Sequence, residues 1–115
     1  MNDILEKINK AHCEKYVFEE YDENVAIVTN LNGICVFVEY VEKEDGFVVF
    51  DGGFTTTELL DNFGDSDKMV EKMKKVLTKY QINKVEEALY LDANYQTLEK
   101  GIDRLANAET ELLYK

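Results

Sequence analysis

The residues best placed to do chemistry in this sequence gather where the apolar run Phe47–Phe50 ends in Asp51-Gly52-Gly53. Asp51, Glu58 and Asp61 all lie close to this corner in the sequence. Grouped carboxylates can hold Mg²⁺ or Ca²⁺, or act as a general acid and base. A small metal-dependent or nuclease-like enzyme centred on Asp51 is therefore one hypothesis.

The same corner also fits a purely structural motif, made by Asp51, Gly52, Gly53 and Thr55. Paired glycines permit positive φ and close backbone approach, and the N–H groups at a helix start can bind an anion. The carboxylate of Asp51 would oppose a phosphate there. We therefore expect a structural strand-to-helix corner and no metal at this position.

Other catalytic patterns are missing from the sequence. It contains no GxSxG, HExxH, GxxxxGK[ST] or GxGxxG. His12 is the only histidine and has no acidic partner at a recognisable spacing, so we interpret it as a helix-face residue. Cys13 and Cys35 have neither a CxxC spacing nor nearby histidines, which favours reduced structural thiols. We expect no enzyme activity and no cofactor.

The charge of the chain is unevenly distributed. Residues 1–67 carry 16 acidic and 4 basic side chains, a net charge of −12, whereas residues 68–115 carry 8 acidic and 9 basic ones, a net charge of +1. Such an acidic half repels nucleic acids and anionic membranes and attracts basic protein surfaces. The alternative is an acidic surface kept for solubility. The predicted partner-binding carboxylates are Glu19, Glu20, Asp22, Glu23, Glu39, Glu42, Glu44 and Asp45.

The first half of the chain reads as a helix followed by a meander. Asn2 or Asp3 can cap a helix through about Glu14, whose apolar residues recur at helical spacing. Strands are predicted at 16–21, 25–31, 34–41 and 47–50, and Asn32-Gly33 indicates a tight hairpin turn. Residues 34–41 are apolar at nearly every position, so the middle of that strand should be covered on both faces.

The second half is mostly helical. Thr55 and Glu58 fit a capping box before a helix over 57–62 that Gly64 ends, and Ser66 or Asp67 caps a longer helix to about Tyr80. A strand at 88–91 is expected to pair at the edge of the meander. Asp92 or Asn94 caps the last helix, whose apolar stripe is predicted to be core or, alternatively, a dimer seam. The stripe is Leu98, Ile102, Leu105, Ala108 and Leu112.

These elements predict one α+β domain over residues 1–115. Its parts are an N-terminal helix (1–15), a β-meander (16–51) and helices with a short strand near 88–91 (55–115). The fold class is an antiparallel meander of three to four strands with helices packed mainly on one face. The charged N-terminus does not look like a signal peptide and no apolar run approaches a membrane span, so a cytoplasmic protein is expected.

The corner and its flanking strands resemble the bacterial and phage domain-of-unknown-function family 1828. That family looks like a β-meander whose third strand ends in an Asp-x-Gly-x-Thr motif, here Asp51, Gly53 and Thr55. The resemblance covers roughly residues 22–113. Where family members often have proline after the threonine of the first strand, this chain has Asn30. The resemblance implies a fold and a bacterial or phage setting, and no chemistry.

Three functional hypotheses follow. The first is a non-enzymatic interaction protein whose carboxylates stand where a partner with a basic, nucleic-acid-binding surface expects phosphates. Its most specific form is a phage or mobile-element inhibitor of a bacterial defence nuclease, such as an anti-CRISPR protein. The second is the metal-dependent enzyme at Asp51, and the third is a structural or regulatory homodimer formed through the last helix. The charge asymmetry favours the first.

Overall fold

The fold is built on one antiparallel sheet with four helices. The computed structural model describes residues 4–115 except residue 65. Six strands pair in the order β1-β2-β3-β4-β6-β5. The strands are β1 (Phe18–Asp22), β2 (Val25–Val28), β3 (Phe37–Val41), β4 (Gly46–Phe50), β5 (Asn83–Val85) and β6 (Ala88–Ala93). The helices are α1 (Ile4–Lys10), α2 (Phe54–Phe63), α3 (Asp67–Tyr80) and α4 (Leu98–Tyr114), with a 3₁₀ turn η1 (Glu42–Glu44). This arrangement confirms the predicted α+β class.

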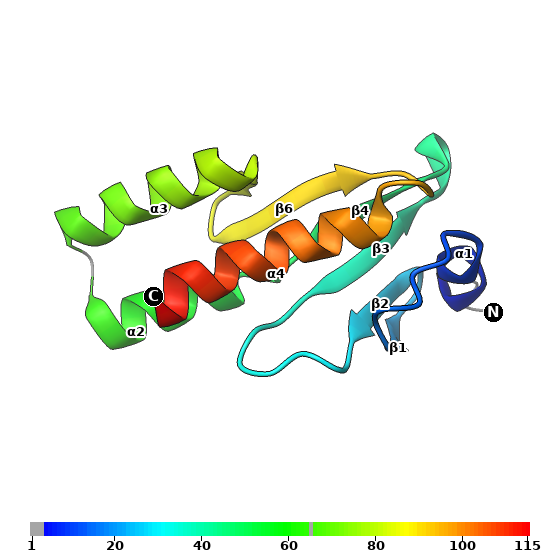
Figure 1. The fold of residues 1–115 in the computed structure, drawn as a ribbon, viewed down its shortest axis with the longest axis horizontal. Helices are drawn as coiled ribbons and strands as arrows, with labels where there is room; N and C mark the ends of the chain where they lie inside the picture. Colours follow the sequence, from blue (N-terminus) through cyan, green and yellow to red (C-terminus); the bar gives the residue numbers. More distant parts are fainter. Residues whose placement is uncertain (1–3, 65) are drawn as a thin grey trace.

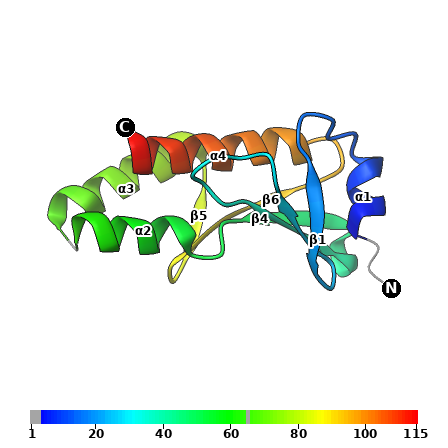
Figure 2. The same cartoon turned by 90° about the horizontal axis from the view of Figure 1, so that it is seen from below.

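One face of the sheet is covered by helices. α4 packs along β4 and β6, while α1 contacts β1, β2 and β3 at the other end of the sheet (Figure 1). Buried residues alternate with partly exposed ones along β2, β3 and β6, as expected when only one face is covered. Figure 2 shows α4 lying along one side of the strands and α2 and α3 gathered at the end far from α1.

The core lies between α4 and the covered face. Every member of the predicted stripe on α4 is buried, which confirms it as core, so a homodimer would have to use another surface. The stripe packs with Val38, Val49, Leu89 and Leu91 of the sheet. Close approach is possible because Gly101 has no side chain: a Cβ there would lie 2.9 Å from Leu91 Cδ1. No helix of the described residues is long and apolar enough to cross a membrane.

The meander differs from the sequence prediction in three places. β2 and β3 do pair antiparallel, but residues 29–36 connect them as an irregular loop, so the tight Asn32-Gly33 hairpin was wrong. The return strand begins at Phe37 rather than at Ile34. Its middle is not covered on both faces, because Val38 and Tyr40 are buried and Glu39 is exposed.

The sheet is also larger than the predicted three to four strands. The strand at 88–91 does pair with β4, as expected, but β5 adds a further strand on its outer side. β5 is short, entirely exposed and polar at two of its three positions, so it carries no hydrophobic alternation that would reveal it.

Several helix ends also differ from the prediction. α1 ends at Lys10 rather than Glu14, and its expected caps, Asn2 and Asp3, lie outside the described residues. The cap of α4 is Thr97 in place of Asp92 or Asn94, because Asp92 belongs to β6. Ser66 does cap α3 through its hydroxyl, which accepts a hydrogen bond from the Met69 amide, and Gly64 does follow α2 with positive φ.

We predict that Gly101→Ala destabilises the protein although alanine is the better helix former. The helix gains about 1 kcal/mol from the substitution, whereas forcing a methyl group against buried Leu91 costs about 1 to 3 kcal/mol. A net loss of about 1 kcal/mol in the free energy of unfolding by urea is expected. Asn107→Ala, at an exposed position of the same helix, should instead leave stability unchanged or slightly raised.

Candidate functional site

Asp51 is fully buried at the corner between β4 and α2, where it binds backbone amides. Its Oδ1 accepts hydrogen bonds from the amides of Gly53 and Leu89, each at 2.9 Å, and its Oδ2 accepts one from the Thr55 amide at 3.0 Å. Asp51 therefore joins the end of β4, the start of α2 and strand β6.

This geometry replaces the predicted capping box. Gly53, with φ of 83°, is the N-cap residue of α2, and Thr55 lies inside the first turn, where no side chain caps the helix. Asp51 supplies the acceptor for the Thr55 amide in place of a cap side chain. The motif Asp51, Gly52, Gly53 and Thr55 is thus a compact structural corner, although its threonine has a different role from the one expected.

Glu109 of α4 is the second buried acid of this corner. Its Oε1 accepts hydrogen bonds from Thr55 Oγ1 at 2.9 Å and from the Cys35 amide at 3.3 Å, while its buried Oε2 has no hydrogen-bond partner among the described residues. Burial, with a smaller contribution from the charge of Asp51, raises the pKa of Glu109 to about 8. Glu109 is consequently protonated at neutral pH. No sequence pattern marks Glu109 as special, because it is one of 24 acidic residues in the chain.

The predicted metal group does not assemble. Asp51 is buried and accepts hydrogen bonds from backbone amides, whereas Glu58 is half-buried and Asp61 is exposed on α2. Within residues 4–64 and 66–115, no three His, Cys, Asp or Glu side chains are placed so that they could hold a metal ion. The amides of Gly53 and Thr55 at the start of α2 already donate to Asp51, so these two donors are not available to an anion.

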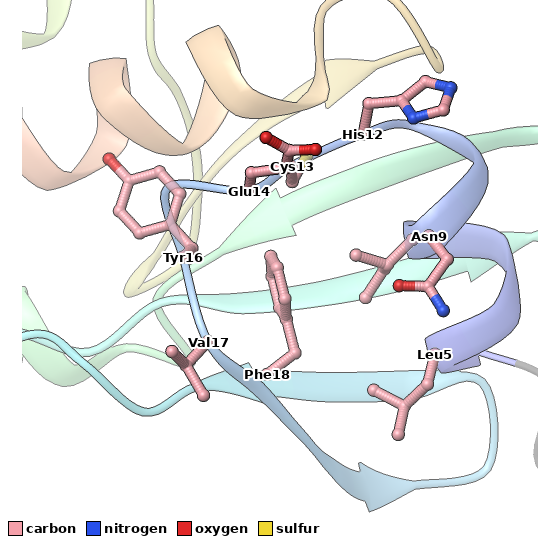
Figure 3. Close-up of a pocket in the computed structure, with 9 residues that line it drawn as sticks. Leu5, Asn9, His12, Cys13, Glu14, Tyr16, Val17 and Phe18 are labelled. Carbon is pink, nitrogen blue, oxygen red and sulfur yellow. The ribbon is translucent and has the colours of Figure 1, made fainter.

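A pocket of about 490 Å³ lies between α1 and the chain leading into β1 (Figure 3). It contains His12, Cys13 and Glu14, and Leu5 and Phe18 form its apolar part. The imidazole of His12 points away from the other labelled side chains. Burial raises the pKa of the Cys13 thiol to about 11, helped by the charges of Glu99 and Asp103, so the thiol is not ionised at neutral pH. The pocket therefore does not form an activated nucleophile.

The face of the sheet opposite α4 has a regular pattern of side chains. Because cross-strand partners project to the same face, the strand register defines two neighbouring rows. The acidic row is Asp22, Val25, Glu39, Val48 and Asp92, on strands β1, β2, β3, β4 and β6. The aromatic row is Glu19, Ile27, Phe37, Phe50 and Tyr90 on the same strands. We call these two rows together the open face.

Carboxylates alternate with valines in the acidic row, whereas three rings lie on adjacent strands in the aromatic row. Asp22, Glu39 and Asp92 are exposed and stand on alternate strands, about 10 Å apart, since neighbouring strands are about 4.8 Å apart. In the aromatic row, Phe37 stacks on Phe50 with ring centroids 5.3 Å apart. Tyr21, in the β-bulge of β1, is 63% exposed and meets Phe37 edge-on at 4.8 Å. The open face therefore offers aromatic surface beside a line of negative charge.

The structure divides the eight predicted partner-binding carboxylates into groups. Glu19, Asp22 and Glu39 belong to the open face, whereas Glu20 pairs with buried Ala26 and so projects to the other side of edge strand β1. Glu23 follows in the turn after β1, and Glu42 and Glu44 lie in η1. All eight are exposed.

Asp45 is the member of that set with a clear structural role. Its Oδ1 accepts hydrogen bonds from the hydroxyl groups of Tyr40 at 2.6 Å and Tyr95 at 2.9 Å, and these bonds lower its pKa. Asp45 thus ties the β3–β4 connection to the loop before α4.

Sequence reasoning missed several residues of the open face: Tyr21, Phe37, Phe50, Tyr90 and Asp92. The alternation Phe37-Val38-Glu39-Tyr40-Val41 was a usable signal, because a single charge in a strand otherwise apolar marks the exposed side. Asp92 was assigned to a helix cap, so its place in the acidic row depended on the extent of β6.

The chain matches no protein-family model, no curated protein and no solved structure. The resemblance to domain-of-unknown-function family 1828 therefore stays a prediction. What the structure establishes is a class: an α+β domain with a six-stranded antiparallel sheet, helices on one face and an acidic, aromatic surface on the other.

We predict that Asp51→Asn is strongly destabilising. The amide nitrogen of asparagine would face at least one of the three backbone N–H groups that now donate to the carboxyl oxygens, so a donor would oppose a donor in the interior. A loss of about 3 kcal/mol in the free energy of unfolding is expected, measured by urea denaturation. Asp61→Asn, exposed on α2, should change stability by less than about 0.5 kcal/mol.

The raised pKa of Glu109 predicts an unusual pH dependence of stability. Between the ordinary pKa of 4.5 and about 8, the folded chain keeps a proton that the unfolded chain has lost. The free energy of unfolding should therefore fall as pH rises through this window, by about 1.4 kcal/mol for each unit of difference between the folded and unfolded pKa values. It should level off above about pH 8.

Glu109→Gln removes this titration while keeping an acceptor for Thr55 and Cys35. Urea unfolding from pH 5 to 9 should show that the difference in stability between the variant and the wild type grows with pH. Glu71→Gln, at an exposed position of α3, is the matched control and should keep the wild-type slope. An unchanged slope in Glu109→Gln would contradict the assignment.

Proposed function

We propose that this protein is a non-enzymatic binding domain whose open face takes up a basic surface of a protein partner. The observation that supports it is the pairing of the acidic row with the aromatic row on a sheet face that none of the described helices covers. A binding surface of this kind needs an apolar centre that excludes water and charges that select the partner.

The two rows contribute in different ways. Rings such as Phe37 and Tyr21 offer rigid contact area, and aromatic residues carry much of the energy in many interfaces. The exposed carboxylates of Glu39 and Asp92 contribute less affinity each, but with the net charge of −11 they speed encounter with a cationic partner. The same charges disfavour direct binding to nucleic acid or anionic membranes.

The most specific form of the proposal is an inhibitor of a nucleic-acid-handling enzyme of bacterial defence, in the manner of an anti-CRISPR protein. An enzyme of that kind has a basic channel for phosphates, and regularly spaced carboxylates can occupy it instead. The resemblance to family 1828 supports a bacterial or phage setting, and an inhibitor of this kind would act in the cytoplasm.

The test is capture of partners from a bacterial lysate on the immobilised protein, followed by elution with rising salt. Glu39→Lys with Asp92→Lys reverses the acidic row, and Glu6→Lys with Glu71→Lys makes the same change in charge elsewhere on the exposed surface. The proposal expects a salt-eluted protein that the control retains and the acidic-row variant loses, because exposed charges are screened within about 8 Å at physiological salt.

A second step separates inhibition from simple binding. The captured protein is tested for binding of labelled duplex DNA or RNA with and without the wild-type domain; an inhibitor should compete, and Tyr21→Ala should weaken the competition about tenfold or more. A partner retained equally by the acidic-row variant would contradict the open face as the site. If the acidic-row variant loses the partner, but the partner still binds nucleic acid in the presence of the wild-type domain, only the inhibitor form of the proposal is contradicted.

A further inference from the structure

We propose a second binding site, for an acidic amphipathic helix of a partner protein, in the groove between α2, α3 and the β5–β6 hairpin. The groove has a volume of about 440 Å³. It lies in the part of the molecule far from α1, where α2 and α3 form the two arms of a helical hairpin (Figures 1 and 2). Neither the charge nor the aromatic side chains of the open face take part in it.

The lining is mainly apolar and comes mostly from α3. Met69, Val70, Met73 and Leu77 lie on one side of that helix, and Leu60 of α2 stands on the other side of the groove. Leu60 is 38% exposed and Val70 is 40% exposed, and neighbouring Phe63 is 63% exposed. Exposed apolar residues grouped in this way mark interaction surfaces, and flexible methionine side chains adapt to an incoming helix.

A buried polar atom also lacks a partner here. Thr56, on the first turns of α2, lines the groove and is only 7% exposed, yet its Oγ1 makes no hydrogen bond within the described residues. An unpaired buried hydroxyl costs roughly 1 to 3 kcal/mol. The oxygen itself is covered, so the contacts for a bound helix come from the apolar residues and the lysines that border the groove.

The charges around the groove select an acidic partner. Lys74 and Lys84 border it, together with the single carboxylate of Glu87. A smaller apolar groove of about 290 Å³, which shares Met69, is bordered by Lys68 and Lys72. All of these lysines except half-buried Lys72 are exposed, so the apolar surface is framed by positive charge in a chain that is otherwise strongly acidic.

The shape favours a helix over an extended chain. From Val70 to Leu77 the groove follows α3 for about 10 Å, since a helix rises about 1.5 Å per residue. A third helix laid there would pack in the space between α2 and α3 and present residues at i, i+3, i+4 and i+7. About three turns of such a helix would bring its acidic side within reach of Lys74 and Lys84.

The experiment is a selection of displayed 16-residue random peptides on the purified wild-type protein, with Val70→Asp as counter-selection. Enriched peptides are synthesised and titrated by fluorescence anisotropy. The proposal expects apolar residues at helical spacing together with Asp or Glu, and at least tenfold weaker binding to Val70→Asp. Val17→Asp is the matched control, since Val17 is exposed outside this groove, and it should bind as the wild type does.

Two further variants test the charge and the hydroxyl. The double variant Lys74→Glu with Lys84→Glu should weaken peptide binding about tenfold or more. The control Lys10→Glu with Lys43→Glu changes two other exposed lysines and should leave peptide binding unchanged. Thr56→Val keeps the shape of the side chain and removes the unpaired hydroxyl, so its melting temperature should stay equal or rise and peptide affinity should not change.

The site is overturned if no peptide is enriched over the counter-selection, or if enriched peptides lack acidic residues or helical spacing. It is also overturned if sedimentation shows a dimer that Val70→Asp dissociates, because the groove would then belong to a second copy of the chain. Failure of the open-face experiments would leave these results unaffected, since no variant used here touches that face.

Discussion

The fold depends on one buried carboxylate. Asp51 lies where β4 ends and α2 begins, and it binds amides of both the corner and β6. Two of its donors, Gly53 and Thr55, are near it in the sequence, whereas the third, Leu89, is 38 residues away. A neutral side chain could pair with these amides only weakly, and an apolar one would leave them unsatisfied in the interior. The position of α2 and the pairing of β4 with β6 therefore follow from the same group.

The second acid of the corner shows how this constraint extends to α4. Glu109 contacts Thr55 on α2 and the amide of Cys35 in the β2–β3 connection. Burial, with a smaller contribution from the charge of Asp51, keeps Glu109 in its protonated form there. Together the two carboxyl groups connect the last helix to the meander, α2 and β6.

Local patterns in the sequence predicted the elements better than they predicted their connections. The helical stripe from Leu98 to Leu112, the Ser66 cap and the strand pairing with β4 were all confirmed, since periodicity and cap chemistry are local signals. The Asn32-Gly33 turn was wrong because the loop between β2 and β3 is fixed by distant contacts, among them the Cys35 amide on Glu109 and Gly33 against Tyr114. Such contacts join residues that no local pattern relates.

The same distinction explains what could be said of the candidate site. Composition predicted that the acidic half holds partner-binding carboxylates. Three of the eight predicted residues, Glu19, Asp22 and Glu39, lie on the open face, and their role in binding stays a prediction. Composition could not predict that Asp92 completes their row, or that Phe37 and Phe50 stack beside it, because both follow from strand register. Asp51 was recognised as the key residue of the corner, but its burial and its amide partners required the fold.

The way the helices are anchored explains why a groove is left between α2 and α3. A salt bridge between Lys79 and Glu111 joins α3 to α4. The Arg104 side chain of α4 also donates hydrogen bonds to the carbonyl groups of Tyr80 and Gln81 at the end of α3. α2 is held to α4 separately, through Thr55 on Glu109 and buried Leu59. Each helix is therefore positioned by its own contacts with α4. The apolar residues between them stay exposed at the lysine-rich end of the protein, while the carboxylates of the open face lie across the sheet from α4. A chain of this size thus keeps two surfaces of opposite charge apart, and partners of opposite charge could occupy them without competing.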